Sequence, residues 1–374
     1  MLRVLFIVVL ITHGLIQLMG FVSQWQLAIL PQLTGRSLIP VSSDMAKVLG
    51  IGWLVACVGF VLAAVSYGLR KDLWLVTALL SIVVSQALIV VYWPDAKAGT
   101  IANLIVLVVI GFAYANLRFD QKADQAAQQL LAKEPLDRTI ITTDMLVNLP
   151  EPVKQWLMKA DVLGKEKIRT VRLRQQGLMR TRQDGKWMAA EAEQYFTVDQ
   201  PGFVWKATIQ MAPLLQLNGF DQYKNGHGGM TIQFMSLINI ADEKGPEMDQ
   251  GALVRFLSEI IWFPTAVLSS YIRWEAVDDR SAKATMTYGG VTASGIFRFN
   301  SHGDIAGFEA QRYRQADSHY ILDTWTTTSD TYRALCNGIR IPTQGAATWK
   351  FKTGDFTWYK LAITAIDYNQ SALY

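Results

Sequence analysis

Residues 248–269, with the sequence MDQGALVRFLSEIIWFPTAVLS, decide the fold of this chain. Their composition predicts a helix that begins near Asp249 and is kinked at Pro264. Arg255 and Glu259 near its middle argue against a membrane span. A helix that is apolar on nearly all sides must be buried on all sides, so we expect other elements to surround this one. Its apolar residues are Leu253, Val254, Phe256, Leu257, Ile260, Ile261, Trp262, Phe263, Val267 and Leu268.

The segments before and after this helix alternate polar and apolar residues with a period of two, which predicts β-strands. Many short strands connected in sequence favour an antiparallel sheet, and a strongly curved sheet is the economical cover for the helix. Two-residue hairpin turns, which need positive φ, are predicted at Asp184-Gly185, Asn225-Gly226 and Gly289-Gly290. The predicted strands are residues 168–181, 186–198, 203–210, 217–224, 229–238, 271–278, 282–288, 291–299, 305–314, 321–328, 346–353 and 356–367.

The first third of the chain contains four apolar stretches without a charged side chain, each near the length of a membrane-spanning helix. They cover residues 4–19, 48–69, 73–93 and 101–117. We therefore predict an α+β fold in which a four-helix transmembrane bundle (1–119) precedes a curved antiparallel sheet, a half-barrel wrapped around the apolar helix. A helical linker (120–162), broken at Glu134–Pro135, would lead to this β-domain (163–374).

Lysine and arginine near the predicted spans indicate the orientation of the bundle. With the N-terminus inside, the inner side has five basic residues and the outer side three, which predicts a multi-pass protein of the bacterial cytoplasmic (inner) membrane with a cytoplasmic β-domain. One span fewer would place that domain outside the cytoplasm. The inner residues are Arg3, Arg70, Lys71, Arg118 and Lys122, and the outer ones are Arg36, Lys47 and Lys97.

The charge distribution argues against a nucleic-acid partner. Of 35 basic and 31 acidic residues, seven basic and three acidic ones precede residue 120, so the remainder carries 28 of each. A neutral domain lacks the electrostatic attraction that dominates nucleic-acid binding. The sequence also has no HExxH, CxxC, P-loop or GxSxG motif and no strand-bound GxGxxG motif, so we predict no cofactor and no metal site, and leave catalysis undecided with a preference against it.

Polar residues within the predicted spans allow two interpretations. His13 and Gln17 are four residues apart and share a helix face. They could form a polar seam for a proton or a quinone-like ligand, or hydrogen bonds that hold the helices together. The second interpretation is favoured because no charged residue accompanies them.

Several short stretches resemble known families. Residues 192–198 (AEQYFTV), 201–205 (PGFVW), 245–264 and 274–279 (WEAVDD), together with Arg312-Tyr313, are similar to a bacterial family of unknown function, DUF6544-like, over about 150–369. The curved sheet over an apolar helix, closed by residues 338–342, 349–351 and 361–369, resembles the LolA/LolB-like lipoprotein-carrier fold. Residues 93–104 (WPDAKAGTIANL) resemble DoxX-type membrane proteins. The family implies no activity.

The apolar helix carries the candidate ligand-binding residues. Arg255 and Glu259, spaced i,i+4, can form an ion pair. Arg255 could face an anionic headgroup in an apolar cavity, with Trp262, Phe256 and Phe263 as its apolar partners. The alternative is a structural pair that joins the helix to the sheet.

Other clusters have simpler interpretations. Glu191 and Glu193 lie on one strand face with arginines, which favours a salt-bridge ladder over acid–base chemistry. Glu275, Asp278 and Asp279 are best read as a charged turn rather than a metal site. His227 belongs to a hairpin turn.

Three hypotheses for function follow. The leading one is a membrane-anchored protein that binds a membrane lipid or another hydrophobic small molecule in the β-domain. The second is a hydrolase or transferase for a lipid-like substrate, with Glu259, Asp278 or Asp279 as acid or base. The third is a docking module for a membrane-protein partner.

Overall fold

The computed structural model describes residues 2–132, 138–316 and 319–374. The chain consists of two units, Met1–Arg118 and Phe119–Tyr374. The predicted break at Glu134–Pro135 lies outside the described residues.

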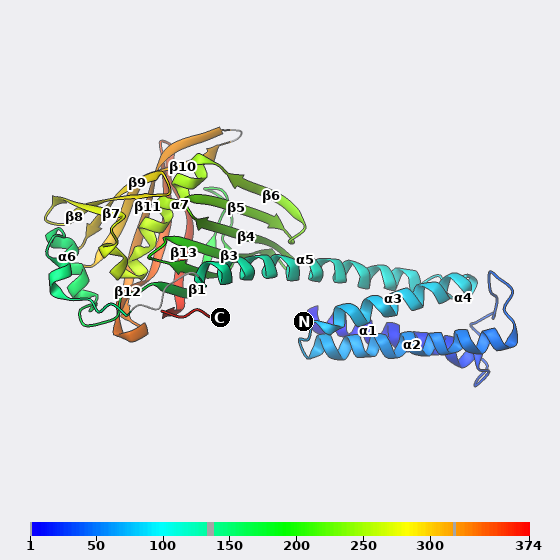
Figure 1. The fold of residues 1–374 in the computed structure, drawn as a ribbon. Helices are drawn as coiled ribbons and strands as arrows, with labels where there is room; N and C mark the ends of the chain where they lie inside the picture. Colours follow the sequence, from blue (N-terminus) through cyan, green and yellow to red (C-terminus); the bar gives the residue numbers. More distant parts are fainter. Residues whose placement is uncertain (1, 133–137, 317–318) are drawn as a thin grey trace. The chain divides into compact units, whose positions relative to one another are not determined.

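Long apolar helices build the first unit (Figure 1). Its helices are α1 (Leu2–Gln24), α2 (Ser43–Gly68), α3 (Leu73–Val91), the short α4 (Trp93–Ala96) and the first part of α5 (Gly99–Leu131). Among the described residues, α1, α2, α3 and α5 are long and apolar enough to cross a membrane. The prediction of four long apolar helices is thereby confirmed. The fourth is longer than predicted because the stretch 101–117 and the linker after it form one continuous helix.

The polar residues of these helices contact one another. His13 Nε2 lies 2.8 Å from Asn103 Oδ1 and 3.2 Å from Gln17 Nε2. Asn103 Nδ2 donates to Ser85 Oγ at 3.2 Å and to Gln86 Oε1 at 3.1 Å. The contacts join α1, α3 and α5, so the structure favours hydrogen bonding between helices over a polar seam.

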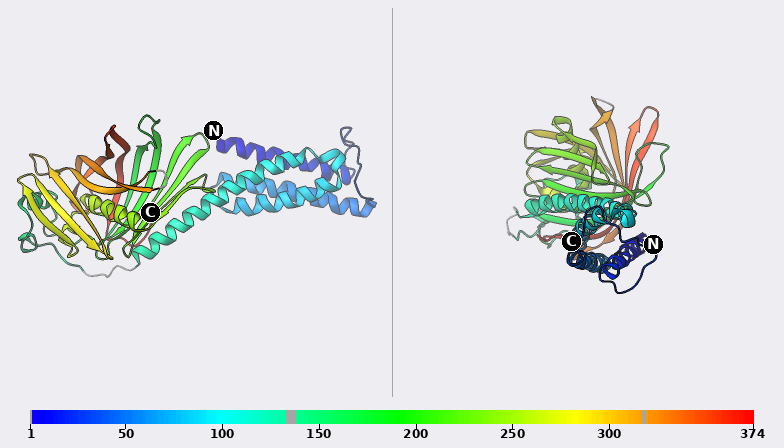
Figure 2. Two further views of the ribbon diagram at one scale, coloured as in Figure 1. Left: turned by 90° about the horizontal axis from the view of Figure 1, so that it is seen from above. Right: turned by 90° about the vertical axis from the view of Figure 1, so that its right-hand side faces the viewer.

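A single curved sheet of thirteen antiparallel strands forms the second unit (Figures 1 and 2), which confirms the predicted fold class. The strand order is β6-β5-β4-β3-β2-β1-β13-β12-β11-β10-β9-β8-β7, so β1 pairs with β13. The strands are β1 (Thr170–Met179), β2 (Met188–Thr197), β3 (Gly202–Ala212), β4 (Leu215–Lys224), β5 (His227–Phe234), β6 (Ile238–Lys244), β7 (Ile272–Asp278), β8 (Ser281–Tyr288), β9 (Val291–Phe299), β10 (Ile305–Ala316), β11 (His319–Ala334), β12 (Arg340–Phe351) and β13 (Gly354–Tyr368).

Two of the three predicted hairpin turns are present. Asn225-Gly226 and Gly289-Gly290 have positive φ at both positions, as such turns require. The prediction of a two-residue turn at Asp184-Gly185 was wrong, because residues 180–187 form a longer connection between the strands. The register therefore shifts by two residues, and Glu191 pairs with Gln176 instead of Leu178. A shift of two keeps every side chain on its predicted face.

Strand β6 was not predicted as a separate element. The sequence pattern suggested one strand over 229–238, but Met235 and Ser236 both have φ of 56° and turn the chain. Neither residue is a glycine, the usual signal for such a turn.

Helix α7 (Pro246–Glu259) lies against the inner face of the sheet, the face toward the centre of its curvature (Figure 2). The predicted helix over 248–269 was too long, because α7 ends at Glu259 and continues as two 3-10 turns, η2 (Ile260–Trp262) and η3 (Pro264–Leu268). Phe263 is extended (φ −139°, ψ 71°), as expected for a residue before proline. The prediction that this segment is buried is correct, since Leu253, Phe256 and Phe263 are fully buried.

A glycine allows α7 to approach the sheet closely. A Cβ atom on Gly228 of β5 would lie 2.5 Å from the carbonyl oxygen of Met248 and 2.8 Å from Ala252 Cβ. No side chain fits there without moving the helix.

The remaining helices complete the unit. They are η1 (Thr143–Leu146), α6 (Glu151–Lys159), which was predicted, and η4 (Cys336–Gly338). Residues 119–131 of α5 cover the outer face of the sheet, where Phe119 and Leu130 pack in one cluster with Tyr195, Val204 and Phe220.

Candidate functional site

A cavity of about 390 Å³ lies between α7 and the inner face of the sheet. This volume falls within the range of small-molecule sites in proteins. Most of the exposed lining surface is apolar, and five of the lining residues are tryptophans. The large apolar lining residues are Met179, Met188, Trp205, Ile209, Leu217, Met230, Ile232, Met248, Ile261, Trp262, Trp325, Trp349, Trp358 and Leu361.

Charged residues meet on one side of this cavity. Arg255 Nη1 lies 2.5 Å from Asp221 Oδ2, and Arg255 Nε lies 2.9 Å from Glu259 Oε1. The expected i,i+4 pair is thus part of a triad that links α7 to β4. The Arg255 guanidinium also lies 5.0 Å from the ring centroids of Phe203 and Trp205. Two ion pairs and two aromatic rings hold Arg255 in place.

Glutamines of β1 and β2 extend this network. Gln194 Nε2 donates to Glu259 Oε2 at 2.9 Å, and Gln175 Nε2 donates to Gln194 Oε1 at 3.1 Å. Tyr359 and Trp205 both donate to Gln175 Oε1, at 3.1 and 3.3 Å. Both oxygens of Glu259 therefore have protein partners.

Arg312 of β10 is the second arginine of the cavity, and it is bound differently. Its Nε donates to the carbonyl oxygen of Gly251 at 3.0 Å, and its guanidinium lies 4.8 Å from the ring centroid of Trp325. Within the described part of the chain, no carboxylate forms an ion pair with Arg312, and its two Nη groups have no hydrogen-bond partner. Burial and the nearby Arg255 lower the pKa of Arg312 to about 10, so it stays protonated at neutral pH.

Burial also acts on the two carboxyl groups. It raises the pKa of both Asp221 and Glu259, although the Arg255 guanidinium opposes this effect. With both carboxyl groups ionised, two arginines face two carboxylates and the site is neutral. Protonation of either carboxyl group leaves a net positive charge beside the apolar wall.

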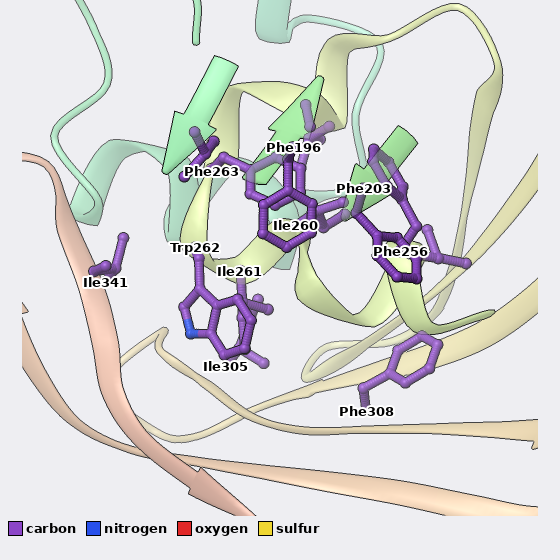
Figure 3. Close-up of a cluster of buried hydrophobic side chains, with 14 of the residues drawn as sticks. Phe196, Phe203, Phe256, Ile260, Ile261, Trp262, Phe263, Ile305, Phe308 and Ile341 are labelled. Carbon is purple, nitrogen blue, oxygen red and sulfur yellow. The ribbon is translucent and has the colours of Figure 1, made fainter. Parts of the chain in front are cut away.

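Three of the five residues proposed from the sequence line the cavity: Arg255, Glu259 and Trp262. Phe256 and Phe263 are not among the lining residues. Their rings lie 6.2 and 4.8 Å from that of Phe196, within the core. Figure 3 shows both rings beside Phe196, whereas Trp262 points away from this group.

The sequence analysis missed four polar residues of the site: Gln175, Gln194, Asp221 and Arg312. A signal for them existed. Each occupies an inward position of its strand, in phase with apolar neighbours such as Leu173, Phe196 or Phe308. A polar residue in an apolar phase is buried and must find a partner.

The other clusters have structural contacts. Glu193 pairs with Arg174 at 3.1 Å and accepts a hydrogen bond from Tyr195 Oη at 2.9 Å. Glu275 pairs with Arg273 at 3.0 Å on the exposed β7. No group of three or more His, Cys, Asp or Glu suited to a metal ion occurs in the described residues.

The fold and the cavity define a half-barrel domain joined to helices that could span a membrane. Residues 147–368 match a family of unknown function, DUF6920, and the chain belongs to this family. A family of unknown function was expected, although its number differs from the DUF6544-like assignment. No curated protein matches the sequence significantly.

Among the solved structures that match this chain is the crystal structure of a domain from Vibrio parahaemolyticus described as an outer membrane lipoprotein-sorting protein, with 11% sequence identity over 54% of this chain and 86% of that chain. A resemblance to lipoprotein carriers was expected from the sequence, and this structure is described as a lipoprotein-sorting protein. Its TM-score is 0.31.

Proposed function

We propose that this protein is anchored in a membrane by α1, α2, α3 and α5 and holds an amphiphilic ligand with an anionic headgroup in the cavity. The observation that carries the proposal is Arg312, a half-buried arginine that lines an apolar, tryptophan-lined cavity and whose Nη groups have no hydrogen-bond partner among the described residues.

The headgroup would bind Arg312. A guanidinium removed from water without a counterion is costly, and its fork of donors matches a carboxylate or phosphate in a bidentate manner. Arg255 was the headgroup-binding residue proposed from the sequence, but it already forms ion pairs with Asp221 and Glu259. Arg312 takes this role, and the triad then serves to fix α7 beside the ligand.

The ligand's apolar part would contact the tryptophan and methionine side chains. Tryptophan offers a large flat surface, and methionine adapts to irregular apolar shapes. A membrane anchor would keep such a protein beside a supply of amphiphilic molecules. The basic residues that flank the spans support a cytoplasmic β-domain in the bacterial inner membrane, with the outside of the cytoplasm as the alternative.

We do not propose catalysis. Glu259 already has a partner on each carboxylate oxygen, and Asp278 is an exposed residue at the end of β7, outside the cavity lining.

Photolabelling of the full-length chain in phospholipid nanodiscs tests the proposal. The probe is a palmitate that carries a diazirine on its chain, and the adducts are mapped by peptide mass spectrometry. We expect adducts on peptides that contain Trp205, Met230 or Trp325, and a loss of about tenfold in Arg312→Gln, the size expected for a charged hydrogen bond of ~1.5 kcal/mol.

Arg314→Gln is the matched control. Arg314 lies two residues further on the same strand and lines the same cavity, but Asp323 pairs with it at 2.6 Å. Its substitution should leave the labelling unchanged. Equal labelling in all three proteins, or adducts confined to the membrane helices, would contradict the proposal.

A further inference from the structure

Four strand connections lie together at one end of the sheet. Ala189 pairs with Gln210, Gln210 with Gln216 and Leu217 with Phe234, so the connections β1–β2, β3–β4 and β5–β6 are neighbours. The β12–β13 connection joins them because Met179 pairs with Tyr359. We call this end the rim and define it as residues 180–187, 211–215, 235–240 and 350–355.

Large apolar side chains are exposed on two adjacent parts of the rim. The main-chain N–H of Met235 donates to the carbonyl oxygen of Gln216 at 3.0 Å, which holds these two parts side by side. Six side chains are each between 43 and 62% exposed. They are Met211, Leu214, Leu215, Leu237, Ile238 and Ile240. Large exposed apolar side chains that gather on two neighbouring connections mark an interaction surface.

One backbone conformation adds to this observation. Leu214 has φ of 69°, a left-handed conformation that is strained for a bulky side chain. Glycine would fit there without strain and would expose no apolar surface. The β3–β4 connection therefore carries a large apolar residue at a conformational cost.

Basic residues occupy the other part of the rim. The β1–β2 connection contains three basic residues, Arg180, Arg182 and Lys186, and one acidic residue, Asp184. The β12–β13 connection contains two basic residues, Lys350 and Lys352, and one acidic residue, Asp355. The Arg180 guanidinium also lies 4.6 Å from the ring centroid of Trp187. A net positive loop with a tryptophan, beside apolar tips, matches the headgroups and outer acyl region of an anionic bilayer.

Residues 119–131 of α5 lie along β3 on the outer face of the sheet. Leu130 lies near the start of β3, where its Cδ1 would be 2.8 Å from a Cβ atom on Gly202. Asp124 pairs with Lys206 at 2.7 Å, and Phe119 lines a surface pocket with Thr208. This part of the helix thus runs antiparallel to β3, and Phe119 lies nearer to the rim than Leu130 does.

We infer that the rim docks on the surface of an anionic lipid bilayer, with the tips of β3–β4 and β5–β6 in the interface and the basic connections at the headgroups. The cavity extends to this end, since Met179, Thr181 and Met188 line it. A ligand would then pass between bilayer and cavity without crossing water. That last step rests on the proposed function, whereas docking does not.

Site-specific fluorescence in liposomes tests the docking. The full-length chain, with Cys57→Ala and Cys336→Ser, receives one cysteine at Leu237→Cys or Ile240→Cys and is labelled with an NBD fluorophore. The liposomes contain phosphatidylglycerol and a lipid with a nitroxide near its headgroup. We expect a blue-shifted emission and quenching by the nitroxide lipid, both weaker in liposomes of phosphatidylcholine alone.

Val277→Cys is the matched control. Val277 is 51% exposed and lies on β7, the edge of the sheet opposite β6. Its label should stay quenched by water-soluble iodide and unaffected by the nitroxide lipid. Equal behaviour at Leu237 and Val277 would overturn the inference. A blue shift at Leu237 without lipid quenching would also overturn it, because a second copy at the β6 edge would then cover the tip. Neither outcome depends on the palmitate probe, so docking and ligand binding can fail separately.

Discussion

The molecule contains two groups of buried polar side chains, and they differ in how completely their members are bonded. In the helical unit, His13, Gln17, Ser85, Gln86 and Asn103 each contact at least one other member. In the β-unit, Arg255 forms ion pairs with Asp221 and Glu259, whereas the Nη groups of Arg312 have no partner among the described residues. A closed network holds elements together. An open one offers a binding group to a ligand.

The largest expected effect is at the engaged arginine. Arg255→Met leaves Asp221 and Glu259 buried without their cation, which should lower the free energy of unfolding by ~3–5 kcal/mol. A urea titration of the detergent-solubilised chain, followed by tryptophan fluorescence, measures this loss. The combination Arg255→Met, Asp221→Asn and Glu259→Gln should recover most of it. A loss below about 1 kcal/mol in the single variant would show that the triad adds little.

Asn103→Leu should have a smaller effect on the closed network. It removes the partner of His13 and Ser85, and hydrogen bonds between membrane helices contribute about 1–2 kcal/mol. The free energy of unfolding, measured by titrating the purified chain with SDS, should fall by that amount, and palmitate labelling should be unchanged. Changed labelling would mean that the two networks are coupled.

Arg312→Gln should have the smallest effect on stability. Arg312 is half-buried and has no direct ion pair among the described residues, so its replacement should change the free energy of unfolding by less than about 1 kcal/mol. The same urea titration measures it. A loss as large as that of Arg255→Met would identify Arg312 as structural and would remove the basis for the ligand.

Binding of an anionic ligand should change by only severalfold with pH. Burial raises the pKa of Asp221 and Glu259, so these groups gain protons as the pH falls through the raised values, and the cavity becomes positive. A diazirine-bearing alkyl sulfonate, whose charge does not change in this range, should label the cavity more strongly at acidic pH.

Glu259→Gln should flatten this profile. Because the folded-state pKa is raised, the corresponding contribution to stability is present at low pH and is lost as the pH rises through the raised value. Stronger labelling at alkaline pH would contradict the assignment of these groups.

Local patterns allowed much of the fold to be predicted. Strand alternation, the apolar composition of the buried helix and the lengths of the four apolar stretches can each be recognised within one continuous segment of sequence. The Arg255–Glu259 pair was accessible for the same reason, since both residues lie on one helix. The turn at 235–237 was not, because no glycine marks its left-handed residues.

Most of the site depends on contacts between distant strands. Asp221 reaches Arg255 from β4, and Arg312 reaches Gly251 from β10, so neither contact follows from spacing. The roles of Phe256 and Phe263 could not be separated from that of Trp262 for a similar reason. An all-apolar helix does not reveal which side faces a cavity and which side faces the core.

The pairing of β1 with β13 sets an order on folding. Val171 lies opposite Tyr368, so the strand pairing that joins β1–β6 to β7–β13 forms only after β13 has left the ribosome. Until then the sheet is two meanders, β1–β6 and β7–β12, and β1 and β12 are unpaired edges. Contacts this distant in sequence form slowly. During synthesis, the protein therefore passes through a state with open sheet edges, which favours aggregation.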